Sequence, residues 1–419
     1  MASVSTLAPA APALLSPGRP GYRRLSLALF VAGIATFALL YSTQALLPAV
    51  SDALRVSPGD ASWTVAAATG ALALAVVPLS ALSERFGRRS MMTASLVVAV
   101  AVGLAVPFAP NLTVLIVLRA VQGAALAGLP ASAMAFLAEE VEAGALVSAI
   151  GLFVAGNSIG GMSGRIFTGW IAQAWGWRVA LGAVGLLAVA CAVIFRIMVP
   201  KARNFTPRPL SLAGFGRTVG RHLANPLLLR LYGIGALFMV VFGGVYTVIG
   251  YRLTGAPFSL PQGIVGSVFV VYLVGTFASA SSGRVVALLG RRGALYAALV
   301  TTSAGLLVTL MNSLAAVIVG LVLITAGFFT GHAVASSSVS RTVTQARAQA
   351  SALYQAAYYL GSSAGGAIGA AAFHSAGWAA TVGMGLVAMA GVAGLTLYGT
   401  VAARRITRRS REPGHAPAL

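Results

Sequence analysis

The chain has 419 residues, of which 58% are hydrophobic and 8% are charged. Soluble globular proteins carry about 25% charged residues, so this composition excludes an ordinary water-soluble enzyme. There are 28 lysine and arginine residues against 7 acidic ones, and the single cysteine excludes an internal disulfide framework and a multi-cysteine metal site.

Apolar stretches follow one another along the chain, and each is long enough to cross a membrane as a helix. A bilayer core about 30 Å thick needs roughly 20 apolar residues, because each helical residue rises about 1.5 Å. The preceding residues 1–24, rich in Ala, Pro and Ser, predict a disordered cytoplasmic tail. We expect spans over 25–47, 61–82, 91–109, 112–137, 146–170, 177–199, 227–250, 262–283, 293–311, 314–337, 349–373 and 378–401.

The positive charges are distributed unevenly among the loops between these spans. Arg55, Arg178 and Arg252 fall in loops on one side, three arginines lie inside spans, and all the others fall on the opposite side or at the termini. Positive residues are retained on the cytoplasmic side of a membrane. We therefore expect a multi-pass protein of the bacterial cytoplasmic (inner) membrane with both termini cytoplasmic. Membrane topology explains the basic excess without a nucleic-acid partner.

The two halves of the chain repeat each other. The matching positions are Pro58 and Pro261, Gly87-Arg88-Arg89 and Gly290-Arg291-Arg292, residues 156–161 and 361–366, and Gly176-Trp177 and Gly377-Trp378. Matches in the same order, at corresponding points of a six-span unit, indicate duplication. The sequence predicts an all-α membrane protein with six-helix bundles over 25–199 and 227–401, a cytoplasmic linker over 200–226 and a basic tail over 402–419. Two such halves place a cavity at their interface, which is typical of secondary transporters.

Motifs of the first half resemble signatures of the major facilitator superfamily. Ser80-Ala-Leu-Ser-Glu84-Arg85-Phe-Gly87-Arg88-Arg89 is similar to the loop between helices 2 and 3, and Leu118-Arg119-Ala-Val-Gln122-Gly123 to the helix-4 signature of drug exporters. Residues 41–48 and 156–165 resemble drug:proton antiporters of the acriflavine-sensitivity type, although Asn157 stands where the antiporter signature has proline. The resemblance implies the major facilitator fold, with twelve transmembrane helices in two pseudo-symmetric bundles.

The loop after the second span is a candidate cytoplasmic gate. The resemblance implies that its acid meets the N-terminal end of helix 11 and that one of its arginines meets an acid at the end of helix 4, which clamps the halves together in the outward-facing state. Alternatively, the arginines anchor the cytoplasmic face and the glycine makes a tight turn. The candidate gate residues are Glu84, Arg85, Gly87, Arg88, Arg89, Glu139 and Glu140.

Polar residues inside spans mark a candidate pathway for substrate and protons. A buried arginine costs at least roughly 2.5–3.5 kcal/mol near the bilayer centre, so Arg119 is expected to face the cavity, unless it caps backbone carbonyls. Arg165 either meets substrate or extends to the membrane interface. His332, deep within a span, either titrates or serves as a hydrogen-bond partner. The other candidate pathway residues are Gln122, one turn from Arg119, and Tyr41, Gln44, Asn157, Tyr246, Tyr354 and Tyr358.

None of the acidic residues lies in the middle of a span, although many drug:proton antiporters that resemble this chain use Asp or Glu there. Three hypotheses follow: protonation through Glu84 or His332, an anionic substrate attracted by Arg119 and Arg165, or an uncoupled facilitator. We expect a monomeric secondary transporter that exports a small organic solute, a drug-like compound or a metabolite, with proton coupling. Uptake or exchange of a small, anionic metabolite is the alternative. We expect no enzyme activity, no cofactor and no metal site.

One further pattern has an alternative reading outside transport. Gly156-Asn-Ser158-Ile-Gly160 and its repeat around Ser363 match the nucleophile pattern G-x-S-x-G. A serine hydrolase needs this serine on a strand-to-helix elbow with a base in reach. Both copies lie inside apolar spans, where small residues at four-residue spacing allow close helix contact. An intramembrane serine protease, with His332 or His374 as base, is the alternative of another class.

Overall fold

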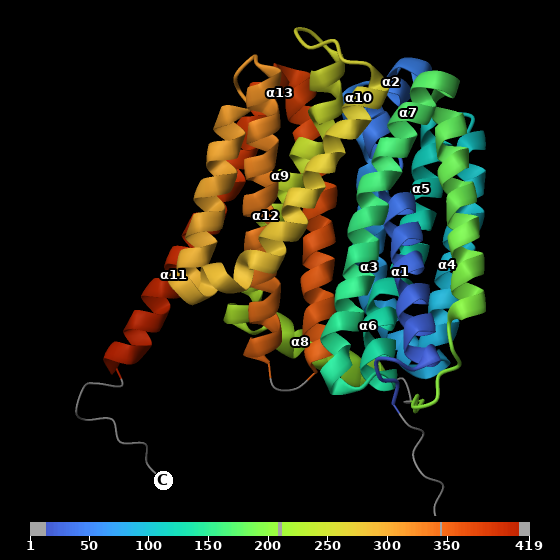
Figure 1. Ribbon diagram of the computed structural model, residues 1–419. Helices are drawn as coiled ribbons and strands as arrows, with labels where there is room; N and C mark the ends of the chain where they lie inside the picture. Colours follow the sequence, from blue (N-terminus) through green and yellow to red (C-terminus); the bar gives the residue numbers. More distant parts are fainter. Residues whose placement is uncertain (1–13, 208–211, 344–345, 410–419) are drawn as a thin grey trace, which may run out of the picture.

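The computed structural model describes residues 14–207, 212–343 and 346–409 (Figure 1). Within these residues the ordered elements are helices, apart from one isolated bridge between Leu15 and Val141. The elements are α1 (Pro20–Tyr41), η1 (Gln44–Leu46), α2 (Leu47–Leu54), α3 (Pro58–Phe86), α4 (Arg88–Ala105), η2 (Val106–Phe108), α5 (Leu112–Leu126), α6 (Gly128–Glu140), α7 (Ala143–Met198), α8 (Leu212–Leu223), α9 (Pro226–Thr254), α10 (Gln262–Ser267), η3 (Val268–Val271), α11 (Tyr272–Val308), α12 (Leu314–Thr342) and α13 (Arg347–Arg409).

Nine helical stretches in the described residues are long and apolar enough to cross a membrane. Three of them, α7, α11 and α13, contain a glycine with left-handed φ: Gly176 at +83°, Gly290 at +68° and Gly377 at +70°. A residue without Cβ adopts this conformation at no steric cost, so each helix bends sharply there into two segments. The nine stretches therefore contain twelve spans, as the sequence predicts.

Proline and capping residues explain where several helices begin. Ser57 accepts a hydrogen bond from the backbone N–H of Asp60 at 3.1 Å, and Pro58 occupies the first helical position of α3. Asn225 accepts from the first backbone N–H groups of α9, which also begins with a proline. A proline is favourable there because the N–H that it lacks would have no partner inside the helix.

The first predicted span is broken rather than continuous. The helix α1 ends at Tyr41, the short helix η1 follows, and α2 begins at Leu47. Pro48 explains the break, because it has no N–H to donate to the carbonyl of Gln44 and its ring crowds that carbonyl. The break leaves Gln44 and the last carbonyl groups of α1 inside the protein, where other side chains can reach them.

Each half of the molecule has its own main hydrophobic core, and the described part of the first half has a smaller one besides, around Leu115 and Trp177. One main core contains residues of the first half, together with Tyr359 from the second. The other main core contains residues of the second half, together with Ala45 from the first. The exposed surface of the helices also carries large apolar side chains, including Leu74, Leu186 and Val387, which suits helices that face lipid. The two main cores agree with the two bundles inferred from the sequence repeat.

Hydrogen bonds between the halves concentrate toward one face of the molecule. Among the described residues, Trp170 Nε1 donates to Ser267 Oγ at 2.9 Å, and the Ser51 and Tyr251 hydroxyls lie 2.6 Å apart. Figure 1 shows α2 and α10 at this face and the described chain ends at the opposite face. The two halves are thus joined at the face away from the chain ends, which we expect to be the outer face.

Three further differences from the predicted boundaries concern the tails and the linker. The helix α1 begins at Pro20, and Leu15 before it donates its backbone N–H to the carbonyl of Glu140 at 2.7 Å, so part of the predicted disordered tail is ordered. The predicted linker contains the helix α8, whose last turn carries Arg221. The helix α13 continues to Arg409, beyond the predicted end of the last span. Residues 1–13 and 410–419 of the predicted tails lie outside the described residues.

Candidate functional site

A cavity of about 200 Å³ lies between the two halves. Its walls come from α1, η1 and α7 of the first half and from α9, α11, α12 and α13 of the second, so it lies at the interface that the duplicated sequence predicts. Most of the wall is apolar or aromatic, with a few polar side chains among them. The lining residues are Phe37, Tyr41, Gln44, Val154, Asn157, Ser158, Gly161, Arg165, Met239, Phe242, Gly243, Tyr272, Phe329, His332, Gln355, Tyr358, Tyr359 and Ser362.

Arg165 dominates one end of the cavity. Its guanidinium Nε donates to Gln44 Oε1 at 2.8 Å, and one Nη donates to the carbonyl of Gly161 at 2.5 Å. The guanidinium carbon lies 4.3 Å from the ring centre of Tyr41 and 4.9 Å from that of Tyr272. We call Arg165, Gln44, Tyr41 and Tyr272 the arginine end of the cavity. The side chain is 2% exposed, so it does not extend to the membrane interface, which was one of the two expectations for it.

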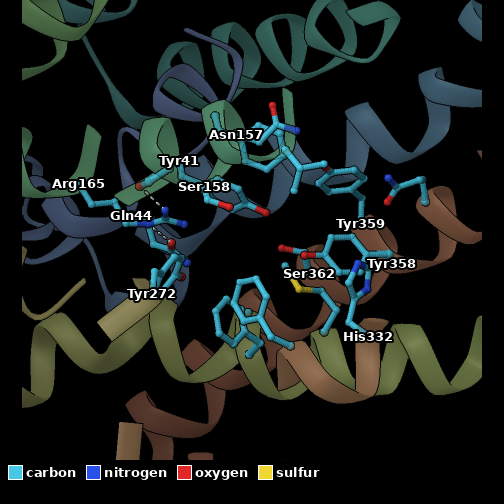
Figure 2. Close-up of a pocket in the computed structure, with 18 residues that line it drawn as sticks. Tyr41, Gln44, Asn157, Ser158, Arg165, Tyr272, His332, Tyr358, Tyr359 and Ser362 are labelled. Carbon is cyan, nitrogen blue, oxygen red and sulfur yellow. Dashed lines mark hydrogen bonds between the residues drawn. The ribbon is translucent and has the colours of Figure 1, made fainter. Parts of the chain in front are cut away.

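His332 lies at the other end of the cavity, with Tyr358 and Tyr359, and we call these three residues the histidine end. Figure 2 shows the arginine end and the histidine end on opposite sides of the cavity. His332 Nδ1 is 2.9 Å from the hydroxyl of Tyr354, and its ring lies 4.7 Å from the ring of Tyr358. The cavity thus has the positive charge of Arg165 at its arginine end, and aromatic rings together with an imidazole at its histidine end.

Arg119 does not face this cavity. Its guanidinium donates to the carbonyl of Thr64 at 3.1 Å and to that of Leu39 at 2.7 Å, and it also donates to the carbonyl of Leu40 and to Gln122 Oε1. Its side chain is 0% exposed. Arg119 therefore binds two carbonyl groups at the end of α1, where the helix breaks, and one carbonyl group within α3. This is the alternative reading of Arg119, and the expectation that it faces the cavity is wrong for this structure.

The other candidate pathway residues divide into two groups. Tyr41, Gln44, Asn157 and Tyr358 line the cavity. Gln122, Tyr246 and Tyr354 lie behind its walls. Gln122 Nε2 donates to the carbonyl of Ala99 at 3.1 Å, the Tyr246 hydroxyl lies 2.6 Å from Thr325 Oγ1, and the Tyr354 hydroxyl holds the His332 ring.

Several residues of the cavity were not predicted from the sequence. Tyr272, Phe242, Phe329 and Tyr359 contribute rings, and Gln355 contributes an amide. An aromatic side chain within an apolar span gives no sign of whether it faces lipid, a neighbouring helix or a cavity. The sequence analysis predicted only Tyr358 from this stretch of α13 as a cavity residue, and its neighbour Tyr359 was missed.

The candidate gate residues lie at the face that carries the chain ends. Arg88 Nε donates to Glu139 Oε1 at 3.1 Å, and another Arg88 nitrogen lies 3.9 Å from Glu84 Oε1. Gly87 makes the turn between α3 and α4 with φ of +92°. The exposed guanidinium of Arg85 lies over the Phe86 ring, and the buried Nε of Arg89 has no hydrogen-bond partner in the described residues. The pairs of this cluster thus lie within the first half.

Glu140 holds the linker rather than an arginine side chain. Its carboxylate accepts hydrogen bonds from the backbone N–H groups of Arg203 at 2.7 Å and Asn204 at 2.9 Å, and from the Asn204 amide at 3.2 Å. The side chain is 2% exposed. Since the Glu140 carbonyl also accepts from Leu15, this one residue joins the start of the described chain, the end of α6 and the linker.

The two serines of the G-x-S-x-G patterns lie within helices. Ser158 lines the cavity, and Ser363 Oγ donates to the carbonyl of Ala66 at 2.8 Å, across the interface between the halves. In the described part of the chain, neither serine makes a hydrogen bond to a histidine, and His332 is bonded to Tyr354 instead. The arrangement lacks the serine–base pair that an intramembrane protease requires.

Two six-helix halves with a cavity between them define a membrane transporter, and comparison with known proteins identifies its family. The sequence profile of the Major Facilitator Superfamily matches residues 25–282. The chain is 40% identical over 367 residues to the uncharacterized MFS-type transporter YybF of Bacillus subtilis, covering 88% of this chain and 91% of that one. It is 37% identical to the inner membrane transport protein YnfM of Escherichia coli, with 86% and 87% covered. The chain belongs to the major facilitator superfamily.

A solved structure shares the fold. A bacterial homologue of the human lysosomal transporter Spinster, in an inward-facing and unoccupied conformation, superposes with a TM-score of 0.74 over 96% of this chain and 100% of that one. Its sequence is 14% identical, so the likeness concerns the fold alone. The chain is thus a multi-pass membrane transporter with the major facilitator fold, and its relatives include a bacterial inner membrane protein.

Proposed function

We propose that this transporter exports a small organic solute from the cytoplasm by alternating access, in exchange for protons, with its binding site in the cavity between the halves. The observation that carries the proposal is the position of the cavity, which both halves line and which lies below their hydrogen-bonded contacts at the expected outer face. Rocking of the halves exposes such a site to each side in turn.

The outward direction is supported by sequence resemblance. The motifs at 80–89, 118–123 and 156–165 resemble those of drug exporters, and an exporter of this type is driven by protons that enter the cell. Among the described cavity residues, His332 is the one histidine, and an imidazole can serve as a proton shuttle. We therefore assign proton coupling to His332, which lines the cavity, and not to Glu84, which lies outside the cavity beside Arg88, at the face that carries the chain ends.

The experiment compares His332→Gln with His374→Gln in proteoliposomes. A metabolite and drug screen of cells with and without the protein first selects an exported solute. An imposed pH gradient is then expected to accelerate transport of this solute by the unmodified protein and by His374→Gln, whose side chain is exposed. His332→Gln is expected to lose the acceleration while it retains solute counterflow without a gradient. Equal transport with and without the gradient in the unmodified protein contradicts proton coupling.

Exchange or uptake of an anionic metabolite is the second candidate function. The observation that favours it is Arg165, a buried cation at the cavity wall that has no carboxylate within 4.0 Å in the described residues. A protein that exchanges one anion for another also needs no side chain that gains and loses a proton during transport. Exchange is favoured over proton antiport by two results together. His332→Gln keeps full transport with every imposed pH gradient, and the same solute added on the opposite side of the membrane accelerates transport.

A further inference from the structure

The guanidinium of Arg165 is only partly satisfied by the protein. Gln44 Oε1 accepts from its Nε and the Gly161 carbonyl accepts from one Nη, whereas the described residues provide no acceptor for its other Nη. They also provide no carboxylate within 4.0 Å to balance its charge. A buried charge without a counter-ion is costly in a low-dielectric interior. At a cavity wall, this arrangement leaves both a hydrogen-bond donor and a positive charge for a ligand.

Arg119 shows what a purely structural arginine is like in the same bundle. It also lacks a carboxylate partner, but its Nε and both Nη groups donate to protein oxygens, three of them backbone carbonyls, and it faces no cavity. The chain thus satisfies one buried arginine with its own acceptors and leaves the other exposed to a cavity. The contrast indicates that Arg119 serves the stability of the fold and that Arg165 is available for binding.

The orientation of the Arg165 guanidinium is held by its surroundings. Gln44, on the broken segment after α1, fixes one edge of the fork, and the rings of Tyr41, Phe269 and Tyr272 lie 4.3, 5.0 and 4.9 Å from its central carbon. Such cation–π contacts contribute roughly 0.5–2 kcal/mol each and replace part of the lost hydration. A planar guanidinium held in this way presents its free Nη in one direction, from which it can donate a charge-assisted hydrogen bond to a carboxylate oxygen.

The rest of the cavity suits an aromatic body. Phe242 and Phe329 line its floor with rings 5.8 Å apart in an edge-to-face arrangement, and Tyr358 completes the aromatic wall beside His332. Stacked and edge-to-face contacts of this kind favour a flat ligand over a branched polar one. We infer that the site takes an aromatic monoanion, with its carboxylate on Arg165 and its ring toward the histidine end. This inference rests on the proposed function, since it names the solute class of the same site.

The charge of such a solute agrees with export. A membrane potential that is negative inside drives an anion outward with about 2.3 kcal/mol per elementary charge per 100 mV. A proton that enters in exchange carries positive charge into the cell, so the same membrane potential favours both movements. An anion held by Arg165 also avoids crossing the bilayer as an unbalanced charge, because the pair is neutral while the halves rock.

The test measures binding by the thermal shift of the purified protein in detergent. The probes are 2-naphthoate, 2-naphthamide and 2-naphthylmethylammonium, which share one ring system and differ in charge. A ligand that binds the folded state raises Tm in proportion to RT ln(1 + [L]/Kd). We expect 2-naphthoate to raise the Tm of the unmodified protein and the amide and the ammonium to have no effect. We expect Arg165→Gln to lose at least about tenfold in naphthoate affinity, the loss of about one charge-assisted hydrogen bond.

Two further variants control for folding and for net charge. Arg178→Gln removes a positive charge from the exposed surface, and it is expected to keep the naphthoate shift. Arg165→Lys retains the charge without the planar fork, and it is expected to bind naphthoate at intermediate affinity. Equal shifts with all three probes, no shift with naphthoate, or an unchanged shift in Arg165→Gln each overturns the inference. Transport of a neutral or cationic solute, blocked by cavity substitutions, would overturn the inference and leave the proposed function intact.

Discussion

Two buried arginines in the first half differ in how many of their N–H groups the protein itself satisfies. Arg119 donates to four described protein oxygens besides a longer contact with Ser42, whereas Arg165 donates to two. Part of the difference arises from the break after α1, which places the carbonyl groups of Leu39 and Leu40 within reach of Arg119. In the sequence both are single arginines in apolar spans, so their roles were not separable there. The resemblance to a helix-4 signature favoured Arg119, and the structure favours Arg165 as the cavity residue.

Arg119→Leu is expected to destabilise the folded protein rather than to change its solute selectivity. The substitution leaves the carbonyl of Leu40 and Oε1 of Gln122 without the donor that Arg119 supplies to them, whereas the Leu39 carbonyl still accepts from Ser42 Oγ at 3.0 Å. Each buried unpaired oxygen costs about 1–3 kcal/mol, so the expected loss is about 2–6 kcal/mol. The measurement is the Tm of the detergent-purified protein, with Arg178→Leu as the exposed control. If Arg119→Leu keeps a normal Tm and loses solute binding, Arg119 acts in substrate binding and not in stability.

At the scale of elements, glycine and proline explain most of what the sequence predicted about this fold. The repeated pairs around Gly87 and Gly290 are the turns between spans, with φ of +92° and +68°. Gly176 and Gly377 form the second such pair. These two repeats thus record a backbone conformation that other residues rarely adopt, which helped to predict the duplication and the span order.

The cavity could be predicted only in part, because its walls come from elements distant in the sequence. Polar residues in apolar spans, such as Gln44, Arg165 and His332, are conspicuous, and they do line the cavity. Tyr272 and Phe242 are not conspicuous, because aromatic residues in a membrane protein serve equally in packing and at interfaces. Whether they line the cavity depends on how α9 and α11 are oriented toward α7. No local sequence pattern predicts this orientation.

The linker between the halves is fixed to the first half by Glu140. Its carboxylate accepts the backbone N–H groups of Arg203 and Asn204, and hydrogen bonds to a charged group are worth about 1.5–3 kcal/mol. Glu140→Gln is therefore expected to increase amide exchange at residues 203–204 by about tenfold, since about 1.4 kcal/mol corresponds to a factor of ten.

Hydrogen–deuterium exchange of peptides that cover residues 200–207 provides this measurement. Glu142→Gln is the matched control, because the Glu142 side chain is exposed and lies two residues further along the chain, between α6 and α7. The control is expected to leave the exchange rate unchanged. If Glu140→Gln also leaves it unchanged, the carboxylate does not hold the linker.

At the scale of the whole molecule, the backbones of the two halves come into close contact where two glycines cross. A Cβ atom on Gly169 of α7 would lie 2.9 Å from the Cα of Gly266 and 3.0 Å from the carbonyl of Gln262 in α10. A Cβ on Gly266 would lie 3.0 Å from the carbonyl of Arg165. Small residues thus allow the backbones to touch at the expected outer face, and the same contact lies directly beside the arginine end of the cavity.

Gly169→Leu is expected to keep the expected outer face open, because a side chain at this position displaces backbone that cannot yield. The cavity residue Ser158, replaced by cysteine in a Cys191→Ser background, reports the change through labelling by a membrane-impermeant maleimide. In right-side-out vesicles, we expect slow labelling of the parent protein, which has Gly169, and labelling at least about tenfold faster in Gly169→Leu. A tenfold change corresponds to a shift of about 1.4 kcal/mol in the equilibrium between the closed and the open outer face. Gly151→Leu on the same helix, with open space at its Cβ, is expected to behave like the parent. Unchanged labelling in Gly169→Leu would mean that the glycine crossing does not close the outer face.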